Sequence, residues 1–158
     1  MGYITEIRKK IGHDKIIHPA ARILIENDQG EFLFVQRLDN GLLGLPAGSI
    51  EYGETIEQCI RREVNEECGL QIDTLTVIGI SSSPTLETVV YPNKDQVQYF
   101  SIEFYSNQWS GKVQISDKEE IQKAEFLPSK YLQSLPPNEI GIVESLAYYR
   151  STGQVLLK

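Results

Sequence analysis

The sequence is poor in cysteine. Its 158 residues include only Cys59 and Cys68, which stand nine positions apart within one predicted helix. At about 1.5 Å of rise per residue, the two thiols lie too far apart for a disulfide. No group of Cys and His with the spacing of metal ligands surrounds them. We therefore interpret both as buried thiols of a protein in a reducing compartment.

Long apolar runs are also absent. No stretch approaches the roughly 18 consecutive apolar residues that span a bilayer. The first residues, MGYITEIRKKIGHDK, lack the apolar core of a secretory signal. These absences predict a cytoplasmic protein without a membrane partner.

Positive charge is scarce as well. Fifteen Lys and Arg stand against 22 Asp and Glu, which gives a formal net charge of −7. Nonspecific nucleic-acid binding needs a basic stripe that neutralises phosphates, and this chain has no Lys/Arg run. We therefore expect no nucleic-acid partner. A phosphate-bearing ligand would have to be bound locally, against the overall field.

What is present fits one globular domain over residues 1–158. The composition is ordinary, with 41% hydrophobic and 23% charged residues, and no repeat or linker interrupts it. Residues 1–18 read as an extension with a short helix, because Ile4, Ile7 and Ile11 recur at helical spacing. The same spacing predicts a C-terminal helix over residues 138–150.

Between these ends the pattern alternates between strands and one central helix. Two strand-like runs, AARILIEN and EFLFVQR, flank the turn residues 28–30 and predict a hairpin. A helix is predicted from Thr55 to Cys68, ended by Gly69. Further strands are predicted over residues 75–83, 96–106 and 123–128. The fold class is therefore α/β (α+β), a mixed β-sheet sandwiched between helices.

The central helix carries acids on its apolar side. Residues 48–69 hold six Glu and two Arg, a local charge of −4. At about 100° per residue, Glu63, Glu66 and Glu67 project on the side that carries Ile56 and Cys59. A solvated helix face does not account for that placement.

Carboxylates on a buried face must be paired, neutralised or bound to a metal, because desolvating a bare charge costs several kcal/mol. Three oxygen donors within about one turn suit Mg²⁺ or Mn²⁺. Zinc fits less well because no His or Cys joins the cluster. The spacing therefore predicts a magnesium or manganese site.

The same segment resembles the signature of a known family. GSIEYGETIEQCIRREVNEECGL matches the Nudix box, G-x5-E-x7-R-E-U-x-E-E-x-G-U with U aliphatic, at every specified position from Gly48 to Leu70. The preceding LLGLPAG is similar to the family's WGLPGG, with Leu43 and Ala47 as departures. The resemblance covers about residues 20–130 and implies the Nudix (MutT-like) fold.

The resemblance implies a function and a set of roles. Nudix hydrolases cleave the pyrophosphate of a nucleoside diphosphate linked to another moiety, with help from divalent metals. Glu63 or Glu66 would act as general base, with Glu63 ranked first, and Arg62 would point away from the metal and pair with Glu54 or another box acid. The implied metal ligands are Glu63, Glu66, Glu67 and the carbonyl of Gly48.

Candidates outside the box are less sharply defined. Family members often add an acid from a later loop; here Glu119 and Glu120 are available, and we favour Glu120 of the two. An exposed loop acid without a role in catalysis fits Glu120 equally well. Arg22 and Arg37 could reach phosphates or serve as solubility charges on edge strands. The candidates for stacking on a base are Tyr99, Tyr91, Phe100 and Trp109, each of which could equally pack in the core.

Two function classes follow. The first is a metal-dependent pyrophosphohydrolase acting on a nucleoside triphosphate, ADP-ribose or a nucleotide sugar and releasing a nucleoside monophosphate. The second is a catalytically silent Nudix-like nucleotide sensor or interaction module, disfavoured because no box acid is missing. The loop over residues 83–95 is expected to select the substrate. Many family members dimerise, so a homodimer is compatible with the resemblance.

Overall fold

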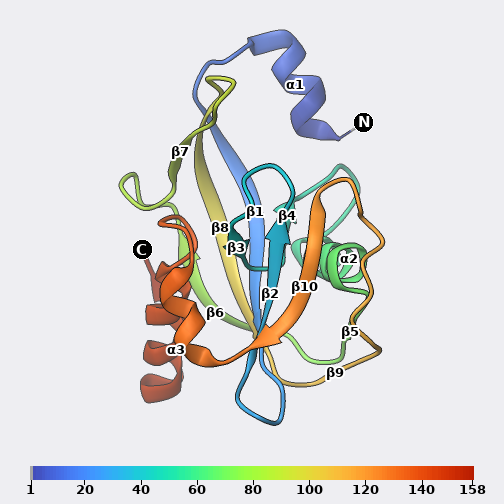
Figure 1. The fold of residues 1–158 in the computed structure, drawn as a ribbon. Helices are drawn as coiled ribbons and strands as arrows, with labels where there is room; N and C mark the ends of the chain where they lie inside the picture. Colours follow the sequence, from blue (N-terminus) through green and yellow to red (C-terminus); the bar gives the residue numbers. More distant parts are fainter. Residues whose placement is uncertain (1) are drawn as a thin grey trace.

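Strand β1 (Ile16–Ile25) is the central strand of the larger sheet in the computed structural model, which describes residues 2–158 (Figure 1). It pairs in parallel with β8 (Gln96–Ser106) on one edge and antiparallel with β4 (Ala47–Ser49) on the other. Beyond β8 lie β6 (Thr76–Ser81) and β11 (Leu156–Leu157), and β7 (Thr88–Val90) pairs with the start of β8. The sheet therefore mixes parallel and antiparallel pairs.

A second sheet holds β10 (Ile121–Leu127), β2 (Phe32–Arg37) and β3 (Leu43–Gly44), and a small ribbon pairs β5 (Gln71–Ile72) with β9 (Trp109–Ser110). The predicted hairpin between the first two strands is wrong. Its turn forms, but one bridge, Glu26 to Phe32, joins the strands before they enter different sheets. The physical reason is that β8 and β4 already occupy both hydrogen-bonding edges of β1.

Helices cover both sides of this arrangement. Helix α2 (Ile56–Cys68) and helix α3 (Gly141–Thr152) lie on opposite sides of the strands, and the short 3-10 helix η1 (Ser129–Ser134) precedes α3 (Figure 1). Helix α1 (Tyr3–Ile11) stands apart at the upper end. The predicted mixed sheet between helices is thus confirmed.

The local sequence explains the bounds of α2. Thr55 caps its start, since its hydroxyl accepts a hydrogen bond from the Gln58 amide while the Gln58 side chain returns one to the Thr55 amide. Gly69 ends the helix in the left-handed conformation, at φ 73°. The helix predicted from these signals is confirmed. The predicted C-terminal helix is also present, but Asn138 and Glu139 lie in the turn before it.

Two hydrophobic cores hold the layers together. Alternate residues of β1 serve each core: Ile23 and Ile25 pack with the α2 side, and Leu24 packs with the α3 side. This double burial explains why β1 reads as a nearly continuous apolar run. Cys59 and Cys68 are buried in the first core as free thiols, as predicted.

Among residues 2–158, none of the helices combines the length and the apolar character needed to cross a bilayer.

Candidate active site

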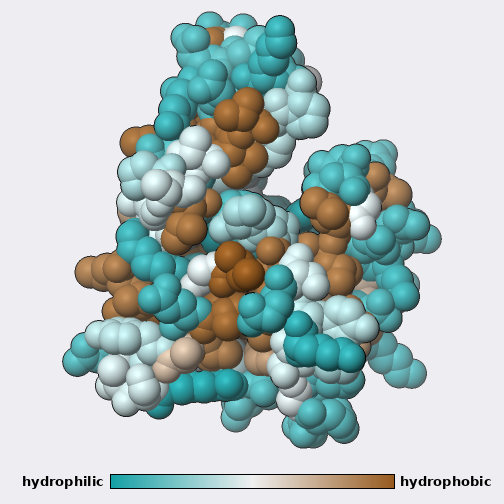
Figure 2. All heavy atoms as spheres, turned by 60° about the vertical axis from the view of Figure 1, so that its left-hand side comes forward, coloured by the Kyte–Doolittle hydropathy of each residue, from teal (hydrophilic) through white to brown (hydrophobic). Residues whose placement is uncertain are grey.

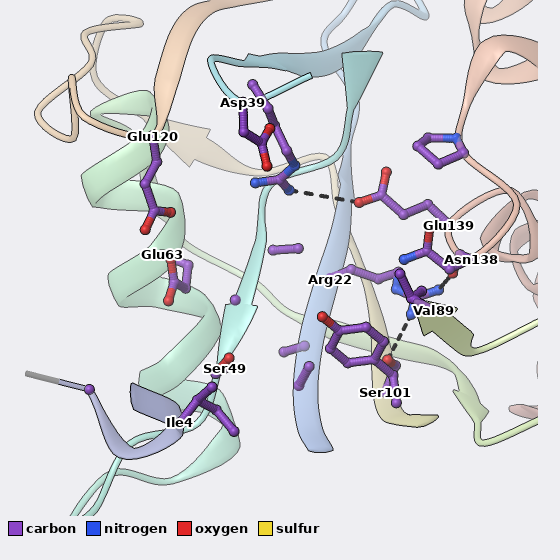
Figure 3. A pocket seen from close by; sticks show the side chains of 18 of the residues that line it. Ile4, Arg22, Asp39, Ser49, Glu63, Val89, Ser101, Glu120, Asn138 and Glu139 are labelled. Carbon is purple, nitrogen blue, oxygen red and sulfur yellow. Dashed lines mark hydrogen bonds and ion pairs between the residues drawn. The ribbon is translucent and has the colours of Figure 1, made fainter. Parts of the chain in front are cut away.

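A cavity of about 610 Å³ opens where β1, β4, β8 and α2 meet. Loops from several parts of the chain complete its walls, and Figure 3 shows Glu63 and Glu120 on one side of it and Asn138 and Glu139 on the other. Figure 2 shows the surface hollowed between the upper part of the molecule, which contains α1, and the body. The cavity therefore joins segments that are far apart in sequence.

Helix α2 carries three carboxylates near this region, and they differ in how deeply they are buried. Glu67 is almost completely buried, with 2% of its side chain exposed, whereas 15% is exposed for Glu63 and 45% for Glu66. Glu63 and Glu66 line the cavity. Glu67 lies behind the lining, where its Oε1 accepts a hydrogen bond from the Ala47 amide at 3.1 Å. The three acids are therefore not equivalent.

Strand β4 comes very close to one of these acids. A Cβ added to Gly48 would lie 2.0 Å from the carboxyl carbon and from Oε1 of Glu63. Any side chain at position 48 would therefore displace the Glu63 carboxylate. The glycine lets the backbone and this carboxylate share one wall of the cavity.

Arg62 joins the loop before α2 to the acids on the helix. Its guanidinium donates to both Glu54 oxygens, at 2.7 and 3.0 Å, and to the Ser49 carbonyl at 3.1 Å. The predicted pairing with Glu54 is confirmed. The prediction that Arg62 points away from the metal side is wrong, because it also donates to Glu63 at 2.8 Å and to Glu66 at 3.4 Å, two of the expected metal ligands. The long side chain turns back along the helix surface.

Burial and pairing set the proton affinities of these groups. Burial raises the pKa of Glu63 to about 7, although the hydrogen bond from Arg62 opposes it. Burial also raises the pKa of Glu67 to about 8, against the opposing charge of Arg37. By contrast, the Arg62 hydrogen bonds lower the pKa of Glu54 below its usual value. A nearby cation would therefore stabilise the ionised forms of Glu63 and Glu67.

Two predicted residues outside α2 lie in the same cavity. Glu120 lines it, and burial followed by the charge of Asp117 raises the pKa of this carboxyl. Glu119 is exposed and is not part of the lining, so of the two candidates Glu120 faces the site. Arg37 lies between two acids, 4.0 Å from Glu67 and 3.8 Å from Glu139. Arg37 therefore links Glu67 of α2 to Glu139 on the opposite side of the cavity.

Comparison with known proteins identifies the family of this chain. The model of the NUDIX domain matches residues 16–148. The chain belongs to the Nudix hydrolase family. The ADP-ribose pyrophosphatase of Methanocaldococcus jannaschii is 31% identical over 140 residues, which cover 85% of this chain and 77% of that protein.

Other similar proteins differ in length or only share the fold. Nudix hydrolase 1 of Caenorhabditis elegans is 29% identical over 156 residues, and the chain spans 39% of its length. The crystal structure of the MutT protein from Methanosarcina mazei Go1 superposes with a TM-score of 0.66 at 20% identity, over 89% of this chain and 99% of that one. This likeness confirms the predicted Nudix fold.

Arg22 lines the cavity of this Nudix domain from a central strand. Arg22 was expected either to reach phosphates or to sit on an edge strand, but β1 is central and the residue is 4% exposed. Its guanidinium donates to Glu87 at 2.6 Å, to Ser101 at 2.7 Å and to the Asn138 carbonyl. The edge-strand alternative is therefore wrong, and contact between Arg22 and a phosphate stays a prediction.

The four aromatic candidates differ in whether they line the cavity. Tyr99 and Tyr91 both line the cavity, and their hydroxyls hydrogen bond to each other. Phe100 is exposed outside the cavity, and Trp109 stacks on Phe126 at 5.1 Å. Only the first pair faces the site of this Nudix domain.

Sequence reasoning missed several residues of the site. Glu87, Asn138 and Glu139 come from distant loops, and Ile4 and Thr5 come from α1, yet all lie in or beside the cavity. Periodicity gives no signal for such residues, because long-range contacts bring them together. The dipeptide Asn138-Glu139 at the start of the predicted C-terminal helix was the one available local sign, since polar residues cluster at helix starts.

The chemistry of the donors fits a hard divalent cation. Glu67 Oε2 is buried without a hydrogen-bond partner, and Glu63, Glu66, Glu120 and the Gly48 carbonyl supply further oxygens nearby. Within residues 2–158, however, no three acidic, His or Cys side chains are already arranged around a single ion position. Arg62 holds Glu63 and Glu66 at present. Cation binding would therefore compete with Arg62 for these two carboxylates.

Proposed function

We propose that the chain hydrolyses the pyrophosphate bond of a nucleoside diphosphate linked to another moiety, uses Mg²⁺ or Mn²⁺, and releases a nucleoside monophosphate. One observation carries this proposal: the charge of the cavity lining. Seven Asp and Glu line it against three Arg, and each of these arginines is already paired with acids. A polyanionic substrate can enter such a cavity only together with cations.

Five groups would hold the cations: the carboxylates of Glu63, Glu66, Glu67 and Glu120 and the carbonyl of Gly48. When bound, divalent cations neutralise the phosphate oxygens and make water a stronger nucleophile. Glu67 would contribute the buried oxygen that has no hydrogen-bond donor. The predicted metal dependence thus has a physical basis in this chain.

The remaining residues would position the reacting groups. Glu63 is the preferred general base, because a carboxyl whose pKa is near 7 can accept a proton from water at neutral pH. Glu66, more exposed, is the alternative base. Arg62, which is itself held by Glu54, would keep the Glu63 carboxylate in its orientation. Tyr99 and Tyr91 offer aromatic surfaces for a base, and Arg37, with 26% of its side chain exposed, would meet a phosphate.

ADP-ribose is the first substrate to test. The M. jannaschii relative is an ADP-ribose pyrophosphatase, and the match covers most of both chains. A nucleotide sugar and a nucleoside triphosphate carry the same diphosphate and remain in the panel. The common chemical feature is a diphosphate that bears a nucleoside on one side.

The test is an assay of the purified chain with ADP-ribose, UDP-glucose and ATP, in Mg²⁺, in Mn²⁺ and in EDTA. We expect a nucleoside monophosphate from at least one substrate with metal, and loss of turnover in EDTA that added Mg²⁺ restores. Tight binding of a nucleotide without release of any monophosphate would support the sensor alternative instead. Turnover that is unaffected by EDTA would contradict the metal requirement.

A further inference from the structure

Helix α1 lies outside the region that matches the Nudix family, yet it forms part of the cavity. The family match begins at residue 16, and α1 ends at Ile11. Gly2, Ile4 and Thr5 line the cavity. Figure 3 shows Ile4 beside Ser49 of β4, on the side of the cavity away from Asn138. One wall of the site therefore comes from a segment that the family fold does not supply.

The start of α1 is fixed to the loop of the Nudix box. The Tyr3 amide donates to Glu51 Oε2 at 2.9 Å, which satisfies one of the free amides at the helix start. The Tyr3 ring also meets Tyr52 edge to face at 5.1 Å. Glu51 and Tyr52 lie between Gly48 and Glu54, so α1 is joined to the segment that leads into the acids.

The far end of α1 is fixed to the turn between β7 and β8. Arg8 donates to the Gln96 carbonyl at 2.8 Å and lies 3.6 Å from Asp95. His13, just after the helix, contacts Asp95 at 2.7 Å. No residue of α1 is fully buried. Contacts at its two ends, more than core packing, therefore hold the helix in place, with its start at the wall of the cavity.

The chemistry of this wall differs from that of the rest of the cavity. Gly2, Ile4, Thr5 and Ser49 are uncharged, and the only charged lining residue joined to α1 is Glu51, whose carboxylate already accepts the Tyr3 amide. The lining contains no Lys. A further phosphate would find no cation here. An apolar side chain beside hydroxyl groups suits a sugar, which presents both C–H surface and hydroxyls.

We propose that Ile4 and Thr5 contact the uncharged, hydroxyl-bearing moiety attached to the diphosphate, so that α1 determines specificity. This inference rests on the proposed function, because it assigns one part of the substrate to one wall of that site. In this arrangement the carboxylates meet the diphosphate, Tyr91 and Tyr99 lie toward the nucleoside, and α1 closes the opposite end. A sugar-linked diphosphate fills the site, whereas a diphosphate alone leaves α1 uncontacted.

The experiment compares ADP-ribose with ADP, which shares its nucleoside and diphosphate but lacks the second sugar. KM and kcat for ADP-ribose and the inhibition constant of ADP are measured with Mg²⁺ for the wild type and for Ile4→Ala. We expect the variant to raise KM about tenfold, to keep kcat within about twofold, and to leave the ADP inhibition constant unchanged. Thr5→Val, at an exposed position, is expected to raise KM about threefold without changing the melting temperature.

The matched control is Ile7→Ala, which removes the same atoms one turn along α1 at a residue that does not line the cavity. KM values for ADP-ribose that match the wild type in Ile4→Ala and Thr5→Val would overturn the inference, as would an equal rise in Ile7→Ala. A wild type that hydrolyses ATP but neither ADP-ribose nor UDP-glucose would also overturn it while leaving the proposed function intact. A wild type that hydrolyses no member of the panel would refute the proposed function itself.

Discussion

Gly48 and Glu63 share a space that holds one carboxylate and no additional carbon. The distance of 2.0 Å from a Cβ at position 48 to the Glu63 carboxyl carbon is far below any real contact. The atoms that would have to move are the end of a flexible side chain, not the backbone. A substitution at Gly48 would therefore act on Glu63 while sparing the fold.

Gly48→Ala is the first prediction. We expect kcat to fall by at least about a hundredfold, because the displaced Glu63 can no longer serve as base or ligand. The melting temperature should fall by only a few degrees. Steady-state kinetics and thermal unfolding measure the two effects. Wild-type kcat in this variant would show that the position of Glu63 does not matter for turnover.

Replacing the acid itself is the second prediction. Glu63→Gln keeps the shape and removes the charge, and we expect turnover to fall by about three orders of magnitude or more. The melting temperature should stay nearly unchanged, because the lost pairing with Arg62 is offset by relief of a desolvated charge. Glu57→Gln on the exposed face of α2 is the control and should retain activity. A fully active Glu63→Gln would exclude Glu63 as the base.

The third prediction concerns a charge pair beneath the cavity. Glu103 is fully buried and receives hydrogen bonds or ion pairs from Lys158 at 2.9 Å and from Ser145 at 2.6 Å. Lys158→Met removes the closer of the two cations, so that among residues 2–158 the ion pair with Arg22 at 3.6 Å remains, together with the hydrogen bond from Ser145. We expect the free energy of unfolding to fall by about 3 kcal/mol or more in urea titrations.

A double variant distinguishes the charge from the packing. Adding Glu103→Gln to Lys158→Met removes the unpaired charge and should restore part of the lost stability. Equal stability of the single and the double variant would mean that the loss came from the lysine's packing instead.

The fourth prediction is a pH dependence of stability. His18 is buried, and burial, helped by the charge of Arg8, lowers its pKa from 6.5 to about 4. Between these two pH values the unfolded chain binds a proton that the folded chain does not. The contribution of His18 to the free energy of unfolding should therefore decrease by about 3 kcal/mol as the pH falls from 6.5 to 4, whereas Glu63 and Glu67, whose pKa values are raised, contribute in the opposite direction.

Urea unfolding at pH 7 and pH 4.5 measures this dependence. The wild type and His18→Phe are compared by the change in the free energy of unfolding between these pH values. This change should favour the folded state by about 2 kcal/mol more in His18→Phe than in the wild type, because phenylalanine keeps the ring next to Tyr99 and cannot bind a proton. His13→Gln changes the other histidine, which is exposed, and should show the same change as the wild type. An equal change in His18→Phe and in the wild type would show that His18 does not contribute to the pH dependence.

For this protein, the sequence predicts local structure better than it predicts which distant segments contact one another. Thr55 and Gly69 fix α2 by contacts within one turn, and the acids of α2 follow from helical spacing alone. The hairpin was wrong for a different reason, since the choice of β1 partners depends on β4 and β8, which come later in the chain. The burial of Arg22 was missed for the same reason, because its partners Glu87 and Asn138 lie more than 60 positions away.

The position of α1 has a practical consequence for anyone who produces this protein. Gly2 lines the cavity, so an affinity tag fused in front of it would begin at the rim of the site. A fragment cut at residue 16 would contain the whole family match and would lack that rim. Kinetic constants from tagged or trimmed preparations would then describe a different binding site, even if both preparations fold normally.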